Sequence, residues 1–221
     1  MKRIIFLRHP QTAFNIEPMR LRGGLDVPLS PHGFAQIPDI CTRLMQAHPD
    51  IKQIYSSPLE RASILATTIA HEFNLKVTKL DGLKSWDYGV LNGKYIKDVI
   101  DVLKQMSTGA GRLLAPKDGE SMIDFLTRLG PGTPEKPGAI KDIIYHAPEE
   151  GCVLVVSHLQ NIMIGAHWLS VGLPENIEEM PYDYKETNEI EPGDWIEIRR
   201  DWVILKELKT VPAEKDKNIY D

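Results

Sequence analysis

Two apolar runs of this sequence end directly in basic side chains. Residues 4–7 are followed by Arg8 and His9. Residues 152–157 are followed by His158. An imidazole can act as a nucleophile or move a proton near neutral pH, and a guanidinium binds anions. Basic side chains placed directly after buried runs therefore indicate a site for an anionic substrate.

A third apolar run, residues 51–57, leads after a short turn to Arg61. Ligands of open parallel sheets bind just beyond the carboxyl ends of the strands, so two imidazoles and two guanidiniums would meet at one edge. These groups would repel one another unless an anion lay between them. Because a planar guanidinium binds phosphate oxygens in pairs, a phosphoryl group is the simplest anion for this cluster.

Strands and helices alternate along the chain, and these elements must position the basic side chains. Short apolar runs rich in β-branched residues predict strands over residues 2–8, 51–57 and 151–157. Capping residues and apolar spacing predict helices over residues 30–48, 57–73, 92–106, 120–129 and 159–172. The alternation predicts an α/β fold, a three-layer α/β/α sandwich with a mostly parallel central sheet flanked by helices.

Two segments should interrupt this regular pattern. Pro38 lies inside the predicted helix 30–48, and we expect a kink or an early break there because proline lacks an amide hydrogen. Residues 130–138, GPGTPEKPG, are rich in glycine and proline and predict a loop.

The C-terminal part of the chain does not continue the alternation of strands and helices. Two apolar runs within residues 188–209 predict a C-terminal β-hairpin, and residues 210–221 are expected to fray. Trp195 and Trp202 lie in this hairpin and could pack on the edge of the sheet or on a second subunit. A homo-oligomer is therefore compatible with the sequence.

The composition limits the possible partners. The chain has 221 residues, an apolar fraction of 42% and a formal net charge of −5, which fit a single domain over residues 1–221. A mildly acidic chain without a basic block argues against nucleic acid and anionic membranes as partners. The apolar runs are shorter than a membrane span of roughly 20 residues or a signal-peptide core of roughly 7–15. We therefore predict a cytoplasmic protein with Cys41 and Cys152 as buried thiols.

Five segments of the chain, taken in order, resemble the histidine phosphatase superfamily, which includes the cofactor-dependent phosphoglycerate mutases. They resemble the family patterns LRHGxTxxN, RxQGxxDxPLTxxGxxQ, SSxLxRAxxTAxxIA, GESxxDxxxR and VSHGGxI. In this sequence the segments read LRHPQTAFN at 7–15, RLRGGLDVPLSPHGFAQ at 20–36, YSSPLERASILATTIA at 55–70, DGESMIDFLTR at 118–128 and VVSHLQNIM at 155–163. One such segment alone is weak evidence, whereas five in family order are strong.

The resemblance implies a role for each matching residue. His9 would be the nucleophile that becomes phosphorylated, and Asn15 would add a neutral donor. Arg8, Arg61 and His158 would bind the phosphoryl oxygens. The family needs no metal and no other cofactor, which agrees with a reaction that mainly requires positioning and neutralisation of charge. His9 must be neutral when it attacks, and the neighbouring arginines disfavour its protonation.

Several positions depart from the family pattern. Pro10 stands where a glycine follows the nucleophile, and proline removes an amide donor. Leu159 and Gln160 stand where two glycines follow the second histidine. Leu159 would narrow the approach of backbone to an anion, and Gln160 would supply a compensating donor to the substrate.

The familiar general acid is missing. Ser85, within LKSWDYG at 83–89, occupies the position of the glutamate in the family pattern LxExxxG, and Leu159 occupies the position of the aspartate that the other branch carries. Asp87 is the nearest replacement, either as the acid or as a turn-capping residue. A general acid contributes roughly 100- to 10,000-fold, so without one the protein should favour phosphates with good leaving groups.

The sequence leaves the roles of the remaining basic residues open. Arg20 and Arg22 either recognise a second anionic group near the site or lie on a solvated face. The imidazoles of His9 and His158 could also be structural, bonded to backbone. The other histidines have no ligand spacing, and we predict no metal site at His32, His48, His71, His146 or His167.

Three functions compete. The first is a metal-independent phosphohydrolase that acts on a small phosphorylated substrate through a phosphohistidine at His9. The second is an impaired family member that binds a phosphorylated ligand or a partner without turnover, as Pro10, Ser85 and Leu159 would suggest. The third is a phosphoglycerate mutase, which would depend on a bisphosphorylated primer. We predict the first.

Overall fold

A five-stranded sheet forms the centre of the computed structural model, which describes residues 2–174, 177 and 190–200. The strands are β1 (Lys2–Arg8), β2 (Ile51–Ser56), β3 (Val77–Lys79), β4 (Cys152–Ser157) and β5 (Trp195–Arg200). Their order across the sheet is β3–β2–β4–β1–β5. Neighbouring strands pair in parallel from β3 to β1, whereas β5 runs antiparallel to β1.

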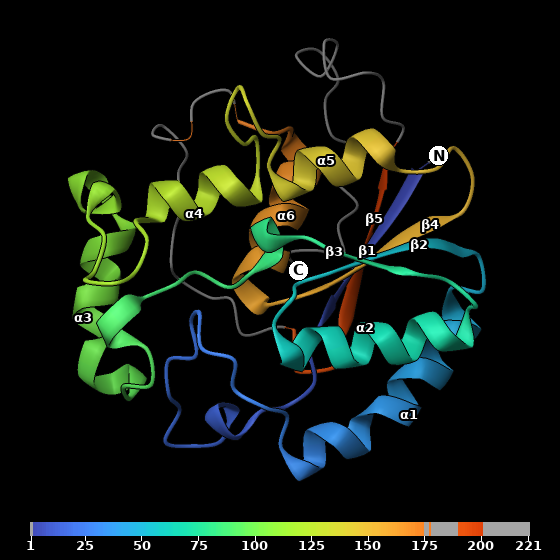
Figure 1. Ribbon diagram of the computed structural model, residues 1–221, viewed down its shortest axis with the longest axis horizontal. Helices are drawn as coiled ribbons and strands as arrows, with labels where there is room; N and C mark the ends of the chain where they lie inside the picture. The colour runs from blue at the N-terminus through green and yellow to red at the C-terminus, as the bar shows by residue number, and fades with distance from the viewer. Residues whose placement is uncertain (1, 175–176, 178–189, 201–221) are drawn as a thin grey trace.

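Helices cover both faces of the sheet (Figure 1). On one face lie α1 (Pro31–Ala47) and α2 (Glu60–Glu72). On the other face lie α4 (Met122–Leu129), α5 (Ala139–His146) and α6 (Leu159–Val171), with α3 (Ile96–Ser107) at the side. The predicted three-layer sandwich with a mostly parallel sheet is therefore confirmed.

Helices cover both faces of the sheet, which explains why the sequences of its strands are continuously apolar. Along β1, Ile4 and Phe6 pack into the core beneath α4, α5 and α6, while Ile5 and Leu7 pack beneath α1 and α2. A strand buried on both faces has no polar alternation. Cys41 and Cys152 are both buried free thiols, as predicted.

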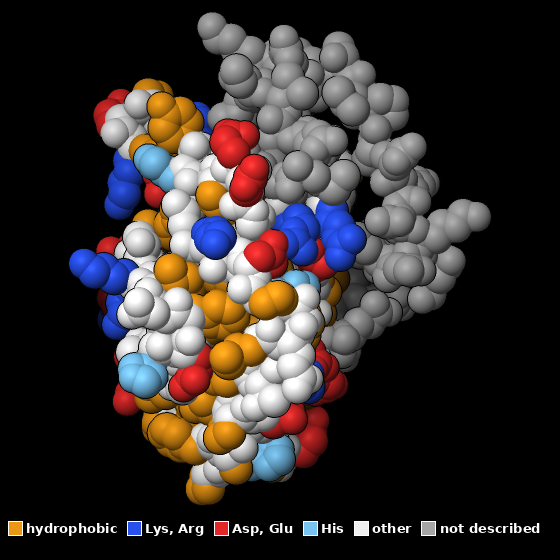
Figure 2. All heavy atoms as spheres, turned by 90° about the vertical axis from the view of Figure 1, so that its right-hand side faces the viewer, with side chains coloured by type: hydrophobic (Ala, Val, Ile, Leu, Met, Phe, Trp, Pro, Cys, Tyr) orange, Lys and Arg blue, Asp and Glu red, His pale blue; other side chains and the backbone are white. Residues whose placement is uncertain are grey.

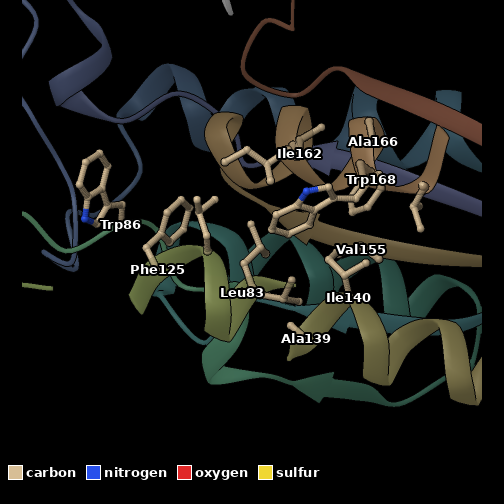
Figure 3. Close-up of a cluster of buried hydrophobic side chains, with 14 of the residues drawn as sticks. Leu83, Trp86, Phe125, Ala139, Ile140, Val155, Ile162, Ala166 and Trp168 are labelled. Atoms are coloured by element: carbon tan, nitrogen blue, oxygen red, sulfur yellow. The ribbon is translucent and has the colours of Figure 1, made fainter. Parts of the chain in front are cut away.

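Short 3₁₀ helices shape the loops around the sheet. They are η1 (Ala13–Asn15), η2 (Asp81–Leu83), η3 (Gly89–Leu91) and η4 (Gly109–Leu113). The segment after η2 is anchored in the larger core, where Trp86 stacks on Phe125 of α4 with ring centroids 6.0 Å apart. Figure 3 shows this stack beside Leu83 and the side chains of α5 and α6. The anchored segment therefore has a fixed position beside the carboxyl ends of the strands.

Three predicted helices differ from the structure. The helix predicted from residue 92 begins at Ile96 as α3. α1 continues through Pro38 to Ala47, so the expected early break does not occur. Pro38 lies on the exposed face of α1, where water can reach the carbonyl group that lacks its helical partner. α2 begins at Glu60 and not at Ser57, because the amide of Ser57, one residue after the end of β2, still donates to the carbonyl of Val156 in β4.

Other elements were not predicted or lie outside the described residues. The loop 130–138 is confirmed, but α5 and the three-residue strand β3 were missed. β5 is the first strand of the predicted hairpin, whereas the second strand, Trp202 and residues 210–221 lie outside the described residues. Trp195 packs beside α1, with the Arg43 guanidinium 5.1 Å from its ring centre.

The amino ends of the parallel strands carry charges of both signs. Arg3 forms ion pairs there with Asp50 and Glu197. Figure 2 shows acidic and basic side chains interspersed on this face. Within the described part of the chain, no helix has both the length and the apolarity that crossing a membrane requires.

The carboxyl ends of three strands meet at the opposite edge of the sheet. Register pairs Arg8 at the end of β1 with Ser157 at the end of β4, and Ser56 at the end of β2 with Val156. The loop after β1 is fixed on the start of α1, because a Cβ atom on Gly33 would lie 2.0 Å from the carbonyl oxygen of Gln11. This close approach requires glycine and fixes the path of the chain after His9.

Candidate active site

Two buried histidines face each other at this edge of the sheet. The ring centroids of His9 and His158 lie 5.3 Å apart, with the rings tilted by 58°. The amide of His9 donates to the carbonyl of Ser157, 3.0 Å away, which continues the pairing of β1 and β4 by one residue. The predicted convergence of the two imidazoles is therefore present in the structure.

The hydrogen bond of His9 fixes its tautomer. Nδ1 lies 2.7 Å from the carbonyl oxygen of Pro10. A carbonyl oxygen only accepts, so Nδ1 carries the proton and Nε2 carries the lone pair. This is the state that a nucleophilic imidazole needs. Pro10, which departs from the family pattern, supplies the carbonyl that orients the ring.

The second histidine is held by a serine that sequence reasoning missed. Nε2 of His158 lies 2.9 Å from Oγ of Ser57, and the same Oγ accepts the amide of Leu59 at 3.3 Å. Nδ1 of His158 is buried and has no hydrogen-bond partner among the described residues. Ser57 follows Ser56 at a strand end, and the position of this pair was the available signal.

Arg61 joins α2 to the loop that follows β1. Its side chain is fully buried, and Nη1 and Nη2 donate to the carbonyls of Leu25 and Gly23 at 2.5 and 3.0 Å. Its Nε has no hydrogen-bond partner among the described residues. Burial lowers the pKa of Arg61 to about 10, against an opposing effect of Asp26. The guanidinium therefore holds the loop while keeping donors available for an anion.

Arg8 joins the site to the segment before β5. Its Nη1 donates to the carbonyl of Ile190, and its backbone amide donates to the carbonyl of Asp194 at 2.9 Å. Burial lowers the pKa of Arg8, while the carboxylates of Glu191 and Asp194 raise it. Like Arg61, Arg8 is therefore hydrogen-bonded to backbone carbonyls, which carry no net charge.

Arg22 belongs to the same cluster, and Arg20 does not. Burial and the charges of Arg8 and Arg61 lower the pKa of Arg22 to about 9. Arg20 instead donates to the carbonyl of Gly93 at 3.2 Å and lies 4.2 Å from the ring centre of Tyr95. Of the two predicted additional cations, the structure brings Arg22 to the site and uses Arg20 to join two loops.

Two predicted neutral donors are oriented by their neighbours. Oδ1 of Asn15 accepts from the amide and the hydroxyl of Thr12, both at 2.9 Å, so Nδ2 stays available. Oε1 of Gln160 accepts from the hydroxyl of Tyr88 at 2.9 Å, so Nε2 stays available. Tyr88 also raises the pKa of Arg22, which places this phenol close to the cationic cluster. Sequence reasoning missed Tyr88.

The carboxylate of Asp87 forms hydrogen bonds within its own turn. Its Oδ1 accepts from the amide of Gly89 at 3.0 Å and from Nδ2 of Asn92 at 2.6 Å. The segment around Asp87 is irregular, so the shared strand face with Ser85 does not exist. The structure therefore favours the turn-capping alternative for Asp87 over the general acid.

Arg128 fixes the segment in which the familiar acid would stand. Its guanidinium donates to the carbonyls of Gly82, Lys84 and Ser85 at 2.9 to 3.0 Å and forms an ion pair with Glu120. Sequence reasoning assigned no role to Arg128, which ends the segment DGESMIDFLTR. It connects α4 to the rim of the site and contributes to lowering the pKa of His158.

Both histidines are uncharged at neutral pH. Burial, followed by the charges of Arg61, Arg22 and Arg8, holds the pKa of His9 well below its usual value. Burial, Arg61 and the neighbouring His9 have the same effect on the pKa of His158. None of the main influences on either imidazole is a carboxylate. Two neutral imidazoles therefore lie among three guanidiniums.

Within residues 2–174, 177 and 190–200, no group of three or more His, Cys, Asp or Glu side chains is arranged to hold a metal ion. The three guanidiniums and the neutral imidazole of His9 give the site the means to bind a multiply charged anion next to a nucleophilic nitrogen.

The buried imidazoles predict a specific dependence of stability on pH. Below pH 6.5, the ordinary pKa of histidine, the unfolded chain takes up protons that folded His9 and His158 do not. The free energy of unfolding should therefore fall as the pH falls below 6.5, by up to about 1.4 kcal/mol per pH unit for each histidine. Urea denaturation of the wild type between pH 8 and pH 5 measures this slope.

The matched variant is His9→Gln, which removes one of these protonation sites. Its stability should fall less steeply than that of the wild type below pH 6.5. The difference between the two proteins at pH 8 reports packing alone, because His9 is then neutral in both states. Parallel curves from pH 8 to pH 5 would contradict a depressed pKa of His9.

Solved structures share this fold. A mycobacterial glucosyl-3-phosphoglycerate phosphatase superposes with a TM-score of 0.68 at 21% identity, covering 93% of this chain and 94% of that chain. A phosphoserine phosphatase from Entamoeba histolytica, in complex with 3-phosphoglyceric acid, superposes with a TM-score of 0.58 at 23% identity. That match covers 76% of this chain and 80% of the other. At these identities the likeness shows the fold.

Curated proteins match shorter stretches of the sequence. Phosphoserine phosphatase 1 of Hydrogenobacter thermophilus is 35% identical over 102 residues, which cover 46% of this chain and 46% of that protein. A bifunctional protein of Mycobacterium tuberculosis is 30% identical over 162 residues, which cover 72% of this chain and 42% of that protein. The matches therefore span about half or less of the length of these two relatives.

The match to a family is more extensive. The sequence profile of the histidine phosphatase superfamily (branch 1) matches residues 4–197, from β1 to β5. This range contains both facing histidines and the three clustered arginines. The order of the five segments, the parallel sheet and the geometry at its edge agree with that match. The chain therefore belongs to the histidine phosphatase superfamily, branch 1.

Proposed function

We propose that this protein is a metal-independent phosphohydrolase in which His9 forms a phosphohistidine intermediate. One observation carries the proposal. The Pro10 carbonyl holds the proton of His9 on Nδ1, so the free nitrogen Nε2 is a neutral nucleophile in a pocket of guanidiniums. Such a pocket attracts a phosphate dianion and leaves the imidazole unprotonated.

The reaction would proceed in two displacements at phosphorus. In the first, the lone pair on Nε2 of His9 forms the N–P bond while the P–O bond to the leaving group breaks. The phosphoryl oxygens contact Arg8 and Arg61, which balance their charge, and the neutral ring of His158. The phosphorylated ring is cationic, and its Nδ1–H continues to donate a hydrogen bond to the Pro10 carbonyl. In the second, water attacks phosphorus, the N–P bond breaks, and phosphate leaves with neutral His9 restored.

Whether the site can protonate the leaving group determines which substrates it favours. Oδ1 of Asp87 is occupied by Gly89 and Asn92, and the main influences on His9 contain no carboxylate. An alkoxide leaving group needs protonation, whereas an acyl, aryl or anhydride leaving group departs without it. We propose that the protein favours phosphates of the second kind.

The relatives suggest the size of the substrate. Their names specify phosphoserine and glucosyl-3-phosphoglycerate as substrates of those proteins. The proposed substrate of this chain is likewise a small phosphorylated molecule. The competing function is binding of such a ligand without turnover, which the engagement of Asp87 in a turn favours.

The nucleophile is tested by turnover of p-nitrophenyl phosphate in excess EDTA. The wild type should release nitrophenol, and His9→Ala should reduce kcat by at least about a thousandfold, because the covalent route is lost. His71→Ala is the matched control, since that side chain is 88% exposed on α2. Equal rates in the His9→Ala variant and the wild type, or activity abolished by EDTA, would contradict the proposal.

The missing acid is tested by comparing leaving groups. The wild type should have a kcat/KM for p-nitrophenyl phosphate that exceeds its value for glycerol 3-phosphate by roughly 100- to 10,000-fold. Asp87→Asn should change kcat/KM for the two substrates by the same factor, because Asp87 acts on the loop. A loss confined to glycerol 3-phosphate would identify Asp87 as the acid and overturn this part of the proposal.

A further inference from the structure

Ser57 and His9 lie on either side of His158, at the ends of three adjacent strands. The sheet order places β4 between β2 and β1. The amide of Ser57 donates to the carbonyl of Val156, and the amide of His9 donates to the carbonyl of Ser157, both at 3.0 Å. Each bond continues the pairing of its strands by one residue. Backbone pairing therefore fixes the positions of the three residues relative to one another.

The hydroxyl of Ser57 has one proton to donate and, among the described residues, one acceptor for it. Its oxygen accepts the amide of Leu59 at 3.3 Å and lies 2.9 Å from Nε2 of His158. The Ser57 side chain is fully buried. A buried donor without an acceptor is costly, so the hydroxyl donates to Nε2.

This hydrogen bond fixes the proton of His158 on Nδ1. The neutral ring carries a single N–H. With that proton on Nε2, both the buried hydroxyl of Ser57 and the buried lone pair of Nδ1 would lack partners among the described residues. With the proton on Nδ1, only the Nδ1–H group lacks one. His158 therefore presents a buried N–H donor that awaits an acceptor.

The two facing histidines thus carry their protons on the same ring atom and present opposite groups. In His9 the Pro10 carbonyl binds Nδ1–H and leaves the lone pair of Nε2 free. In His158 the Ser57 hydroxyl binds the lone pair of Nε2 and leaves Nδ1–H free. A free lone pair can attack phosphorus, whereas a free N–H can bind a phosphoryl oxygen.

We propose that Ser57 is a positioning residue, which makes His158 a hydrogen-bond donor to the phosphoryl group and prevents it from competing with His9 as the nucleophile. This inference rests on the proposed function, which supplies the phosphoryl group. The amide of Leu59 holds the serine oxygen immediately before α2, the helix that carries Arg61. Ser57 therefore connects the second histidine to the start of a helix that supplies a phosphate-binding guanidinium.

The tautomer is measured by nitrogen-15 NMR of the wild-type chain, labelled at its histidines, at pH 8 and without substrate. Protonated and unprotonated ring nitrogens have well-separated chemical shifts, and couplings to the ring C–H groups distinguish Nδ1 from Nε2. The signals of His158 are those absent from His158→Gln. We expect a protonated Nδ1 and an unprotonated Nε2. A protonated Nε2 in the wild type would overturn the inference.

Substitution of Ser57 should release the ring. In Ser57→Ala, part of the population should carry the proton on Nε2, and kcat/KM for p-nitrophenyl phosphate should fall roughly 10- to 100-fold. Ser57→Thr keeps the hydroxyl and should retain the protonated Nδ1 and most of the activity. Ser56→Ala is the matched control, because it removes a buried hydroxyl that donates to the Ser57 carbonyl at 2.8 Å. It should leave the protonation pattern of His158 unchanged.

Two outcomes with the alanine variant would also overturn the inference. An unchanged nitrogen pattern in Ser57→Ala would mean that the serine does not set the tautomer. A changed pattern with the kcat/KM of the wild type would mean that Nδ1–H of His158 does not serve the reaction. If Ser57→Ala does not fold, the spectrum of the wild type still decides.

The proposed function is tested separately in the same sample. Inorganic phosphate should shift the Nδ1 signal of His158, because a phosphate oxygen then accepts its proton in a hydrogen bond. No shift at saturating phosphate would contradict the inference. A wild type that shows the shift but fails to hydrolyse p-nitrophenyl phosphate would reject the proposed function and retain the inference.

Discussion

The concentration of positive charge at one edge of the sheet is the constraint on which the site depends. Buried guanidiniums are costly unless their donors are satisfied. Arg8 donates to the carbonyl of Ile190 and Arg61 donates to those of Gly23 and Leu25, while the Nε of each has no hydrogen-bond partner among the described residues. Carbonyls satisfy the hydrogen bonds and leave the positive charge in place. The site therefore keeps its attraction for an anion.

The same charge controls the protonation of the imidazoles. His9 and His158 lie 5.3 Å apart between ring centres, and both are buried beside the arginines. A positive charge on either imidazole is strongly disfavoured beside these arginines, so both rings are neutral. Pro10 then decides which nitrogen of His9 is free, because its carbonyl accepts a hydrogen bond from Nδ1–H and so keeps the proton on Nδ1. The departure at Pro10 is thus compatible with a nucleophile at position 9.

The sequence predicted the parts of the fold that depend on simple periodicity. The continuous apolar runs identified β1, β2 and β4, and parallel strands necessarily bring their carboxyl ends to one edge. β3 and α5 were missed because they are short and their positions depend on tertiary packing. The expected break at Pro38 did not occur because that face of α1 is exposed to water.

The sequence predicted which residues lie at the site more reliably than it predicted the role of each one. Arg20 and Arg22 are residues of the same type two positions apart, but Arg20 donates to the carbonyl of Gly93 and stacks on Tyr95, whereas Arg22 belongs to the cationic cluster. The sequence left Asp87 open as an acid or a turn cap, because its direction depends on whether residues 85–87 form a strand, and they do not. The link between Ser57 and His158 joins residues that are distant in sequence, which no local pattern reveals.

The most direct test of this account is to capture the intermediate. The wild type would be mixed rapidly with p-nitrophenyl phosphate, quenched in base, where phosphohistidine survives, and examined by peptide mass spectrometry and phosphorus NMR. The account predicts a phosphoryl group on Nε2 of His9, formed before free phosphate accumulates. Release of phosphate from a protein that never carries label on His9, or label on His158 instead, would contradict it.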